Sequence, residues 1–288
     1  FLLACSYLVC RISRIRRSPM MRSTAVSVKK KKKKKGGVGK TTAVANLANA
    51  LAMDGKKVVC IDGDIGLRNL DVVMGLENRI VYDIVDVIEG RCKLKQAMIR
   101  DKHYPEMYLI PAAQTRDKNA VSPSDMVRIC NDLRADSDFV IIDSPAGIER
   151  GFRNAIAAAD RVLVVTNPEV SAVRDADRVV GILEAEEKGS PRLIINRLNP
   201  ALVRNNDMLS AEDVLDLLGI QLIGVVPEDE SVIIGSNRGA PVVTDGKSRA
   251  GQAFRNIAKR LQGIDVPFLD LDQQSGLWGA IQRLTGRK

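Results

Sequence analysis

The chain of 288 residues is long enough to bury the core of one α/β domain. Its net charge is +9, but residues 1–35 hold five arginines and seven lysines and no acid, so the remainder carries a charge of −3. This distribution does not favour a nucleic-acid partner, because a DNA-binding body carries a basic patch of its own. The single histidine, His103, lies in a predicted loop and excludes sites that need two or more histidines, and the five scattered cysteines indicate a reducing compartment rather than a disulfide framework.

Residues 1–34 form a basic N-terminal extension. Residues 1–10 are apolar but too few to span a bilayer, and residues 11–28 are rich in Arg and Ser. No acid occurs before Asp54. This composition is closer to an organelle transit peptide than to a secretory signal, which places its charge before the apolar run. The alternative is an extension without a targeting role.

Residues 35–42 read Lys-Gly-Gly-Val-Gly-Lys-Thr-Thr, which predicts a phosphate-binding loop. Glycines allow backbone N–H groups to surround a triphosphate, and a helix predicted from residue 43 would present its positive N-terminus to the same phosphates. Lys40 would reach the β- and γ-phosphates and Thr41 would bind magnesium. The expected nucleotide-binding residues of the loop are Lys35, Gly36, Gly37, Val38, Gly39, Lys40, Thr41 and Thr42.

Two short apolar runs end in carboxylates. Residues 57–61 are followed by Asp62 and Asp64, and residues 139–142 are followed by Asp143. Each run predicts a buried parallel strand, and carboxylates at the carboxyl ends of such strands lie where nucleotides bind. Each Asp alone is typical of a turn; beside a phosphate loop, the three predict a magnesium-dependent nucleotide site.

Apolar strands alternate with amphipathic helices along the rest of the chain. This order predicts a single-domain, doubly wound, mostly parallel α/β sheet of the P-loop NTPase class over residues 35–268. Further strands are expected at 107–110, 161–166, 193–195 and 221–226, and further helices at 124–134, 172–187, 211–218 and 248–261. Residues 269–275 are a predicted linker before a terminal helix, 276–288.

The residues before the loop conflict with this fold. A phosphate loop follows a central buried strand, yet residues 29–34 are all lysine, and burying six ammonium groups would be very costly. Residues 25–28 are the nearest strand-like segment. Either they supply the strand and a long loop follows, or the sequence upstream of Lys35 is abnormal.

The terminal helix is predicted to be amphipathic. Leu277, Ile281 and Leu284 share one face beside Trp278, and Arg283, Arg287 and Lys288 add positive charge. This pattern predicts a short helix that lies in the interface of an anionic membrane. The alternative is a terminal helix packed on the body.

Several motifs in order resemble the MinD/ParA family of ATPases with a deviant Walker A motif. The loop at 35–42 matches that motif, 62–71 is similar to the family's switch I, and 143–149 is similar to its switch II. Segments 166–178, 196–197 and 226–229 match as well, most closely in the MinD branch, and 152–155 and 267–270 resemble its cyanobacterial and plastid members.

The resemblance implies a role for each matching residue. Lys35 would cross an ATP-dependent homodimer interface to the partner's phosphates, and Asp64 would orient the attacking water with support from Asp62. Thr41 and Asp143 would hold Mg²⁺. Asp175 would lie on a helix that contacts regulatory partners, although a solvated helix face is the simpler interpretation. The remaining nucleotide contacts would be Asn69 beside the γ-phosphate, and Asn196, Arg197 and Pro227 around the adenine.

The resemblance also implies a biological role, namely placement of the division site by an ATPase that cycles on a membrane. The implied partners are a MinE-like activator and a MinC-like division inhibitor, or their plastid equivalents. The implied location is the plastid stroma and inner envelope, or alternatively the bacterial cytoplasm and inner membrane face. The alternative functions are a ParA-type ATPase of DNA segregation and a metal-cluster carrier; the carrier would need a Cys-x-x-Cys pair, which this sequence lacks.

Overall fold

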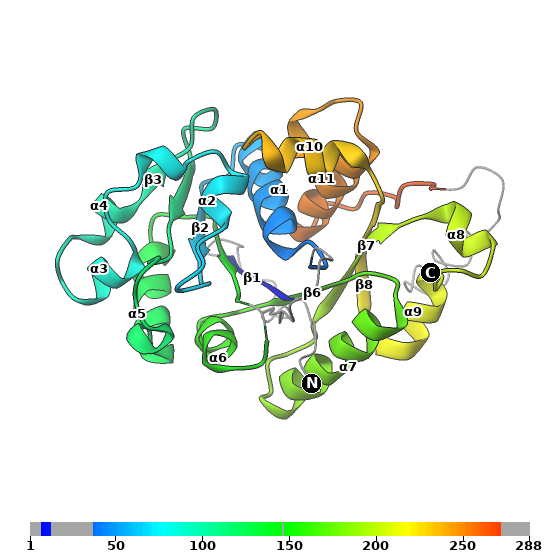
Figure 1. Ribbon diagram of the computed structural model, residues 1–288, viewed down its shortest axis with the longest axis horizontal. Helices are drawn as coiled ribbons and strands as arrows, with labels where there is room; N and C mark the ends of the chain where they lie inside the picture. The colour runs from blue at the N-terminus through cyan, green and yellow to red at the C-terminus, as the bar shows by residue number, and fades with distance from the viewer. Residues whose placement is uncertain (1–6, 13–36, 146, 272–288) are drawn as a thin grey trace.

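The computed structural model describes residues 7–12, 37–145 and 147–271, and within them the chain forms one eight-stranded sheet covered by helices on both faces (Figure 1). The strand order is β3-β4-β2-β5-β1-β6-β7-β8. The strands are β1 (Tyr7–Ile12), β2 (Val58–Asp62), β3 (Ile99–Arg100), β4 (Met107–Ile110), β5 (Phe139–Asp143), β6 (Val162–Thr166), β7 (Arg192–Leu198) and β8 (Gln221–Pro227).

Strands β2, β4 and β5 form one parallel set and β6, β7 and β8 form another. The doubly wound, mostly parallel sheet predicted from the sequence is therefore confirmed, with strand ends shifted by a few residues. The α-helices are α1 (Lys40–Met53), α2 (Leu70–Val73), α3 (Ile84–Ile88), α4 (Leu94–Ala97), α5 (Pro123–Arg134), α6 (Arg150–Ala157), α7 (Val170–Ala185), α8 (Pro200–Arg204), α9 (Ala211–Leu218), α10 (Glu230–Asn237) and α11 (Arg249–Leu261).

The core lies between the sheet and its two helical layers. Helices α1 and α11 pack together on one face, and α5, α6, α7 and α9 cover the other (Figure 1). All five residues of each of β2, β5 and β6 are buried, as expected for strands with helices on both sides. This packing holds the carboxyl ends of β2 and β5 beside the first turn of α1.

The central strand of the sheet comes from residues 7–12 and not from residues 25–28, which were one of the two alternatives that the sequence suggested. Strand β1 lies between β5 and β6 and runs antiparallel to each, with Leu8 opposite Asp143 on one side and Leu163 on the other. The expectation that residues 25–28 supply this strand is wrong. They and the lysine run, 29–34, lie outside the described residues. Their place is taken by β1, whose backbone pairs with both neighbouring strands.

Candidate functional site

The phosphate loop joins α1 through a backbone turn that requires glycine. Gly39 caps α1 with a φ of +88°, in the left-handed region. A Cβ atom at this position would lie 2.4 Å from Nδ2 of Asn196, and that same amide group donates a hydrogen bond of 2.7 Å to the carbonyl of Val38. Val38 is 6% exposed and packs against Ala172 of α7. The loop is thus fixed by β7 and α7, far away in the sequence.

Gly39→Ala is expected to weaken nucleotide binding at least tenfold, because the new methyl group both strains the backbone and displaces Asn196 from Val38. Gly55→Ala is the matched control. Gly55 ends the same helix with a φ of +76°, but an added Cβ there would have no atom within 4 Å. We expect both variants to lose about 1 kcal/mol of stability, whereas only Gly39→Ala should lose affinity in a nucleotide titration.

Three carboxylates lie together at the ends of β2 and β5. Asp62 and Asp143 are opposite each other in the parallel ladder, and the N–H of Gly63 donates to the carbonyl of Asp143 at 2.8 Å. The side chain of Asp143 forms a hydrogen bond with Thr41 and lies in the electrostatic field of Lys40, Asp62 and Asp64. The structure therefore brings the loop and both strand ends into one site, as predicted.

The carboxyl group of Asp143 has an unusual proton affinity. Its pKa is raised to about 7, chiefly by burial; Lys40 and the hydrogen bond with Thr41 lower the pKa, and the negative charges of Asp62 and Asp64 raise it. Burial also raises the pKa of Asp62. Asp62 is 1% exposed and accepts hydrogen bonds from the N–H groups of Asp64, Asn69 and Leu70 at 2.9–3.1 Å. It therefore shapes the switch I turn on which Asp64 stands.

The donor atoms at this site fit magnesium. Oδ1 of Asp143 is buried and has no hydrogen-bond partner among the described residues, and the hydroxyl of Thr41 is bonded to the same carboxylate. Hard oxygen donors suit Mg²⁺, which usually takes only one or two protein ligands and completes its shell with water and substrate phosphates. Within the described part of the chain, no group of three or more His, Cys, Asp or Glu forms a metal site independent of substrate.

The raised pKa of Asp143 predicts that the stability of the nucleotide-free protein depends on pH. Between pH 3.8 and about 7 the folded state keeps a proton that the unfolded state has released, so stability falls as pH rises through this window and is level above it. Asp143→Asn should reduce the slope of the free energy of unfolding against pH by up to about 1.4 kcal/mol per pH unit. Thermal melts in chelator from pH 5 to pH 8 would measure it; an unchanged slope would show that Asp143 is ionised throughout.

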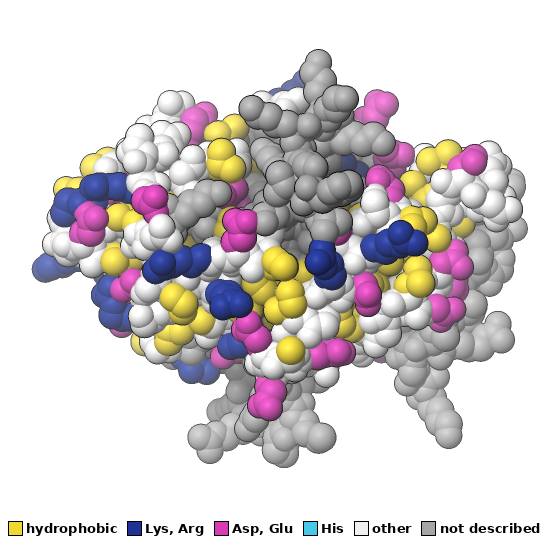
Figure 2. Space-filling model, turned by 60° about the horizontal axis from the view of Figure 1, so that its bottom comes forward, with side chains coloured by type: hydrophobic (Ala, Val, Ile, Leu, Met, Phe, Trp, Pro, Cys, Tyr) yellow, Lys and Arg dark blue, Asp and Glu magenta, His cyan; other side chains and the backbone are white. Residues whose placement is uncertain are grey.

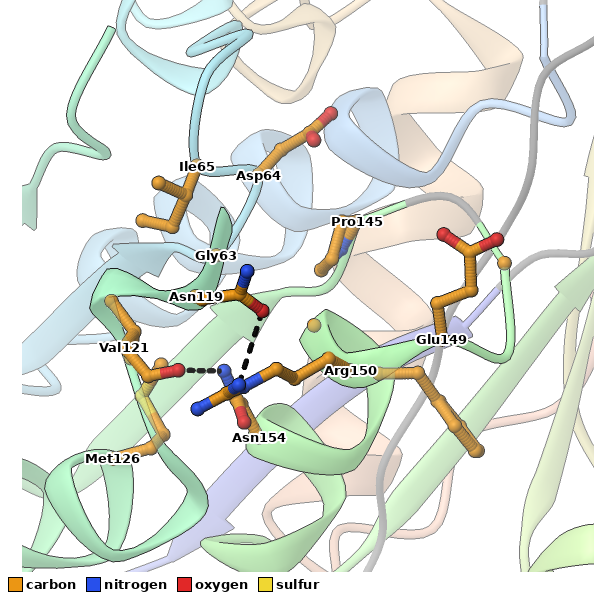
Figure 3. A pocket seen from close by; sticks show the side chains of 13 residues that line it. Gly63, Asp64, Ile65, Asn119, Val121, Met126, Pro145, Glu149, Arg150 and Asn154 are labelled. Carbon is orange, nitrogen blue, oxygen red and sulfur yellow. Dashed lines mark hydrogen bonds between the residues drawn. The ribbon is translucent and has the colours of Figure 1, made fainter. Parts of the chain in front are cut away.

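A hollow of about 240 Å³ opens beside the site, between switch I and α6 (Figure 3). Two hydrogen bonds tie α6 to the segment that precedes α5. Arg150 donates to Oδ1 of Asn119 at 3.0 Å, and Nδ2 of Asn154 donates to the carbonyl of Val121 at 2.7 Å (Figure 3). The same segment reaches switch I, because the N–H of Gly66 donates to the carbonyl of Ala113 at 2.8 Å. Residues 113–121 therefore connect switch I to helix α6, which follows switch II, a role that no sequence motif indicated.

Comparison with known proteins identifies the family. A sequence family described as AAA domain matches residues 26–189. Septum site-determining protein MinD of Bacillus subtilis is 52% identical over 254 residues, covering 87% of this chain and 95% of the relative. MinD of Synechocystis is 55% identical over 236 residues, covering 82% of this chain and 89% of the relative. The chain belongs to the MinD family.

Solved structures agree. The MinC:MinD cell division complex of Aquifex aeolicus matches with a TM-score of 0.76 and 45% identity, covering 82% of this chain and 96% of the other. MinD of Pyrococcus horikoshii, solved with Mg-ADP, matches with a TM-score of 0.71 and 29% identity, covering 85% of this chain and 95% of the other. The protein is thus a MinD-family ATPase of division-site placement, and the ParA-type alternative is less favoured.

Of the remaining predicted site residues of this MinD-family chain, four lie within the described part of the chain and six lie outside it. Asn69 is exposed at the start of α2, Arg197 is half-buried with a φ of +57°, and Pro227 is buried at the end of β8. Asn196 donates from its Nδ2 to the carbonyl of Val38 in the phosphate loop, and its contact with adenine stays a prediction. Residues outside the described part of the chain are Lys35, Gly36, Leu277, Trp278, Ile281 and Leu284.

Asp175 lies on α7, as the resemblance implied, but it is only 3% exposed. The solvated-face interpretation is therefore wrong, and a contact between Asp175 and a regulatory partner stays a prediction. The exposed positions on this part of α7 are Arg174, Asp177 and Arg178. No helix within the described residues is long and apolar enough to cross a membrane.

Proposed function

We propose that the substrate is ATP and that its hydrolysis drives a cycle of dimerisation and membrane attachment in division-site placement. The observation that supports this most directly is the joining of Lys40, Thr41 and Asp143 at one buried site beside Asp64. The test is hydrolysis of ATP together with ATP-dependent sedimentation on anionic vesicles. Hydrolysis without any effect of ATP on sedimentation would contradict the cycle.

Each residue of the site has a distinct task in this mechanism. Lys40 balances phosphate charge, and the first turn of α1 offers its N–H groups to the same phosphates. Thr41 and Asp143 would hold magnesium, which neutralises developing charge on the phosphate oxygens. Asp64 positions the attacking water, and Asp62 holds the turn on which Asp64 stands through its three backbone bonds.

Asp64→Ala is expected to bind ATP normally and still dimerise, but to lose about 100-fold to 10,000-fold in turnover, the range for loss of a positioned proton acceptor. Single-turnover hydrolysis beside an equilibrium binding assay would separate the two effects. Asp177→Ala, an exposed carboxylate on α7, is the control. Normal turnover by the Asp64 variant would remove this residue from the mechanism.

Lys35 is proposed to complete the site across an ATP-dependent homodimer. Its ammonium group would contact the partner's phosphates, as an arginine finger does. Lys35→Ala should therefore leave ATP binding by the monomer unchanged but abolish the dimer seen by light scattering with ATP. A variant that still dimerises and hydrolyses ATP at the normal rate would exclude the cross-subunit role.

The proposed partners are an anionic membrane, a MinC-like division inhibitor and a MinE-like activator. The similar Aquifex structure is a MinC:MinD complex. A regulator docking on α7 would meet Arg174, Asp177 and Arg178, and would act near the phosphate loop because Ala172 of the same helix packs against Val38. The proposed location is the plastid stroma and inner envelope face, or the inner face of a bacterial membrane.

The DNA-segregating alternative has less support. Residues outside the N-terminal 35 carry a net charge of −3, and Figure 2 shows basic and acidic side chains interspersed among the residues coloured on that face. ParA-type structures such as that of Chlorobium tepidum match at 21% identity, which shows the fold alone. Retention on vesicles but not on DNA at the same ionic strength would separate the two functions.

A further inference from the structure

The segment that follows α11 is fixed to the body, although part of it was predicted to be a linker. In Figure 1 it is the red coil that leaves α11 and runs back along the domain. Phe268 and Leu269 pack against the hydrophobic core, and Leu271 is itself 7% exposed. The carbonyl of Asp270 accepts a hydrogen bond from Arg249. We call residues 265–271 the strap.

Arg260 makes several of the contacts that hold the strap. Its Nε donates to the carbonyl of Val266 at 3.0 Å and its Nη2 donates to the carbonyl of Pro267 at 2.9 Å. The guanidinium carbon lies 4.0 Å from the centre of the Phe268 ring, which is a cation–π contact. A planar fork with several donors can make these contacts together, whereas a lysine cannot.

The same guanidinium also anchors itself to the sheet. Nη1 of Arg260 donates to the carbonyl of Ile223 at 2.8 Å. The register of β7 against β8 passes from Leu222 to Gly224, so Ile223 is the extra residue of a bulge in this edge strand. A bulged residue leaves ladder groups unpaired. Arg260 therefore joins β8, α11 and the strap at one point.

We propose that Arg260 is a positioning residue for membrane attachment: it fixes the strap to the body and so sets where the terminal helix leaves the domain. This rests on the membrane cycle proposed above. With the strap fixed, the connection to residue 276 is counted from residue 272 and is four residues long; with the strap released, it is counted from residue 265 and is eleven residues long. Effective concentration falls roughly as the −3/2 power of tether length. Release should therefore weaken ATP-dependent attachment about fivefold.

Three variants of the full chain test the role. Phe268→Ala loosens the strap but keeps the bond from Arg260 to Ile223, and Arg260→Lys removes the fork. Insertion of eight Gly and Ser residues after Leu271 lengthens the tether and leaves Arg260 untouched. All three should bind vesicles containing phosphatidylglycerol about fivefold more weakly with ATP, while dimerising and hydrolysing ATP in solution at the normal level. Chymotrypsin should cleave after Phe268 faster in Arg260→Lys than in the unaltered chain.

Arg255→Ala is the matched control, because Arg255 lies on the same helix but bonds to the carbonyl of Val243 instead of to the strap. It should bind vesicles normally. If Phe268→Ala and the insertion both bind as tightly as the unaltered chain, Arg260 has no positioning role. If the unaltered chain itself does not bind vesicles with ATP, the membrane function fails, a result distinct from unchanged binding by the variants.

Discussion

Lys40→Ala is expected to abolish nucleotide binding, with an affinity at least 100-fold below that of the unaltered protein. Lys40 begins α1 and lies within the electrostatic field of Asp143, in a site that also contains Asp62 and Asp64. Without the ammonium group of Lys40, the triphosphate would lie beside three carboxylates. Only the partial positive charge at the N-terminus of α1, which is worth about 1 kcal/mol, would then attract it. Loss of a charge-assisted contact to phosphate adds a further penalty of roughly 2–3 kcal/mol.

Isothermal titration with ATP and magnesium would measure this loss. Lys95→Ala is the control, since the side chain of Lys95 is 85% exposed and pairs only loosely, at 3.6 Å, with Asp136. Thermal melts of the nucleotide-free variant would check that it folds. If Lys40→Ala bound ATP within threefold of the unaltered protein, residues 37–42 would not be the phosphate site.

Buried elements with continuous apolar runs were predicted well. Strands β2, β5 and β6 are buried throughout, and such runs between glycine-rich or charged turns leave few other arrangements. The strand-end carboxylates followed from the same reasoning, because parallel strands bring their carboxyl ends to one edge. Short helices with little apolar periodicity, such as α2 and α8, had no comparable signal.

Features that depend on distant pairing could not be predicted. The sequence shows that the chain begins with an apolar segment, but it does not show which strands this segment pairs with. In the structure, β1 lies between β5 and β6 and is antiparallel to both. Asn196 and Val38 are 158 residues apart, so the bond between them has no local signature. Residues 269–271 of the strap were likewise predicted to be part of a linker, because the contacts of the strap with Arg260 and Arg249 depend on tertiary packing.

The burial of Asp175 shows that a motif match does not determine whether a side chain is exposed. A motif match placed this carboxylate on the partner helix but did not reveal which way it faces. The structure leaves Arg174 and Arg178 exposed beside it, so a charge-reversal scan of α7 should weaken regulator binding at these two positions. Changes at Asp175, which is 3% exposed, should instead affect stability.

Deletion of residues 276–288 is expected to release the protein from anionic vesicles while leaving ATP binding intact. One short amphipathic helix buries few side chains, so its affinity for a membrane is marginal, and dimerisation joins two such helices. Trp278 and Leu277 should supply most of the hydrophobic contribution to the free energy of membrane binding. Arg283, Arg287 and Lys288 should add about 1 kcal/mol each near an anionic surface. Sedimentation with ATP should therefore fall to the level seen without it.

Trp278→Glu should have nearly the same effect, because it removes the largest apolar side chain of the helix and adds a charge that anionic lipid repels. Arg283→Lys keeps the charge and is the control. Trp278 is the only tryptophan, so its emission reports insertion directly and should shift to the blue only when ATP and anionic vesicles are both present. If the truncated protein still sedimented with vesicles in ATP, the attachment would lie elsewhere on the body, and neither the terminal helix nor the strap before it could account for the cycle.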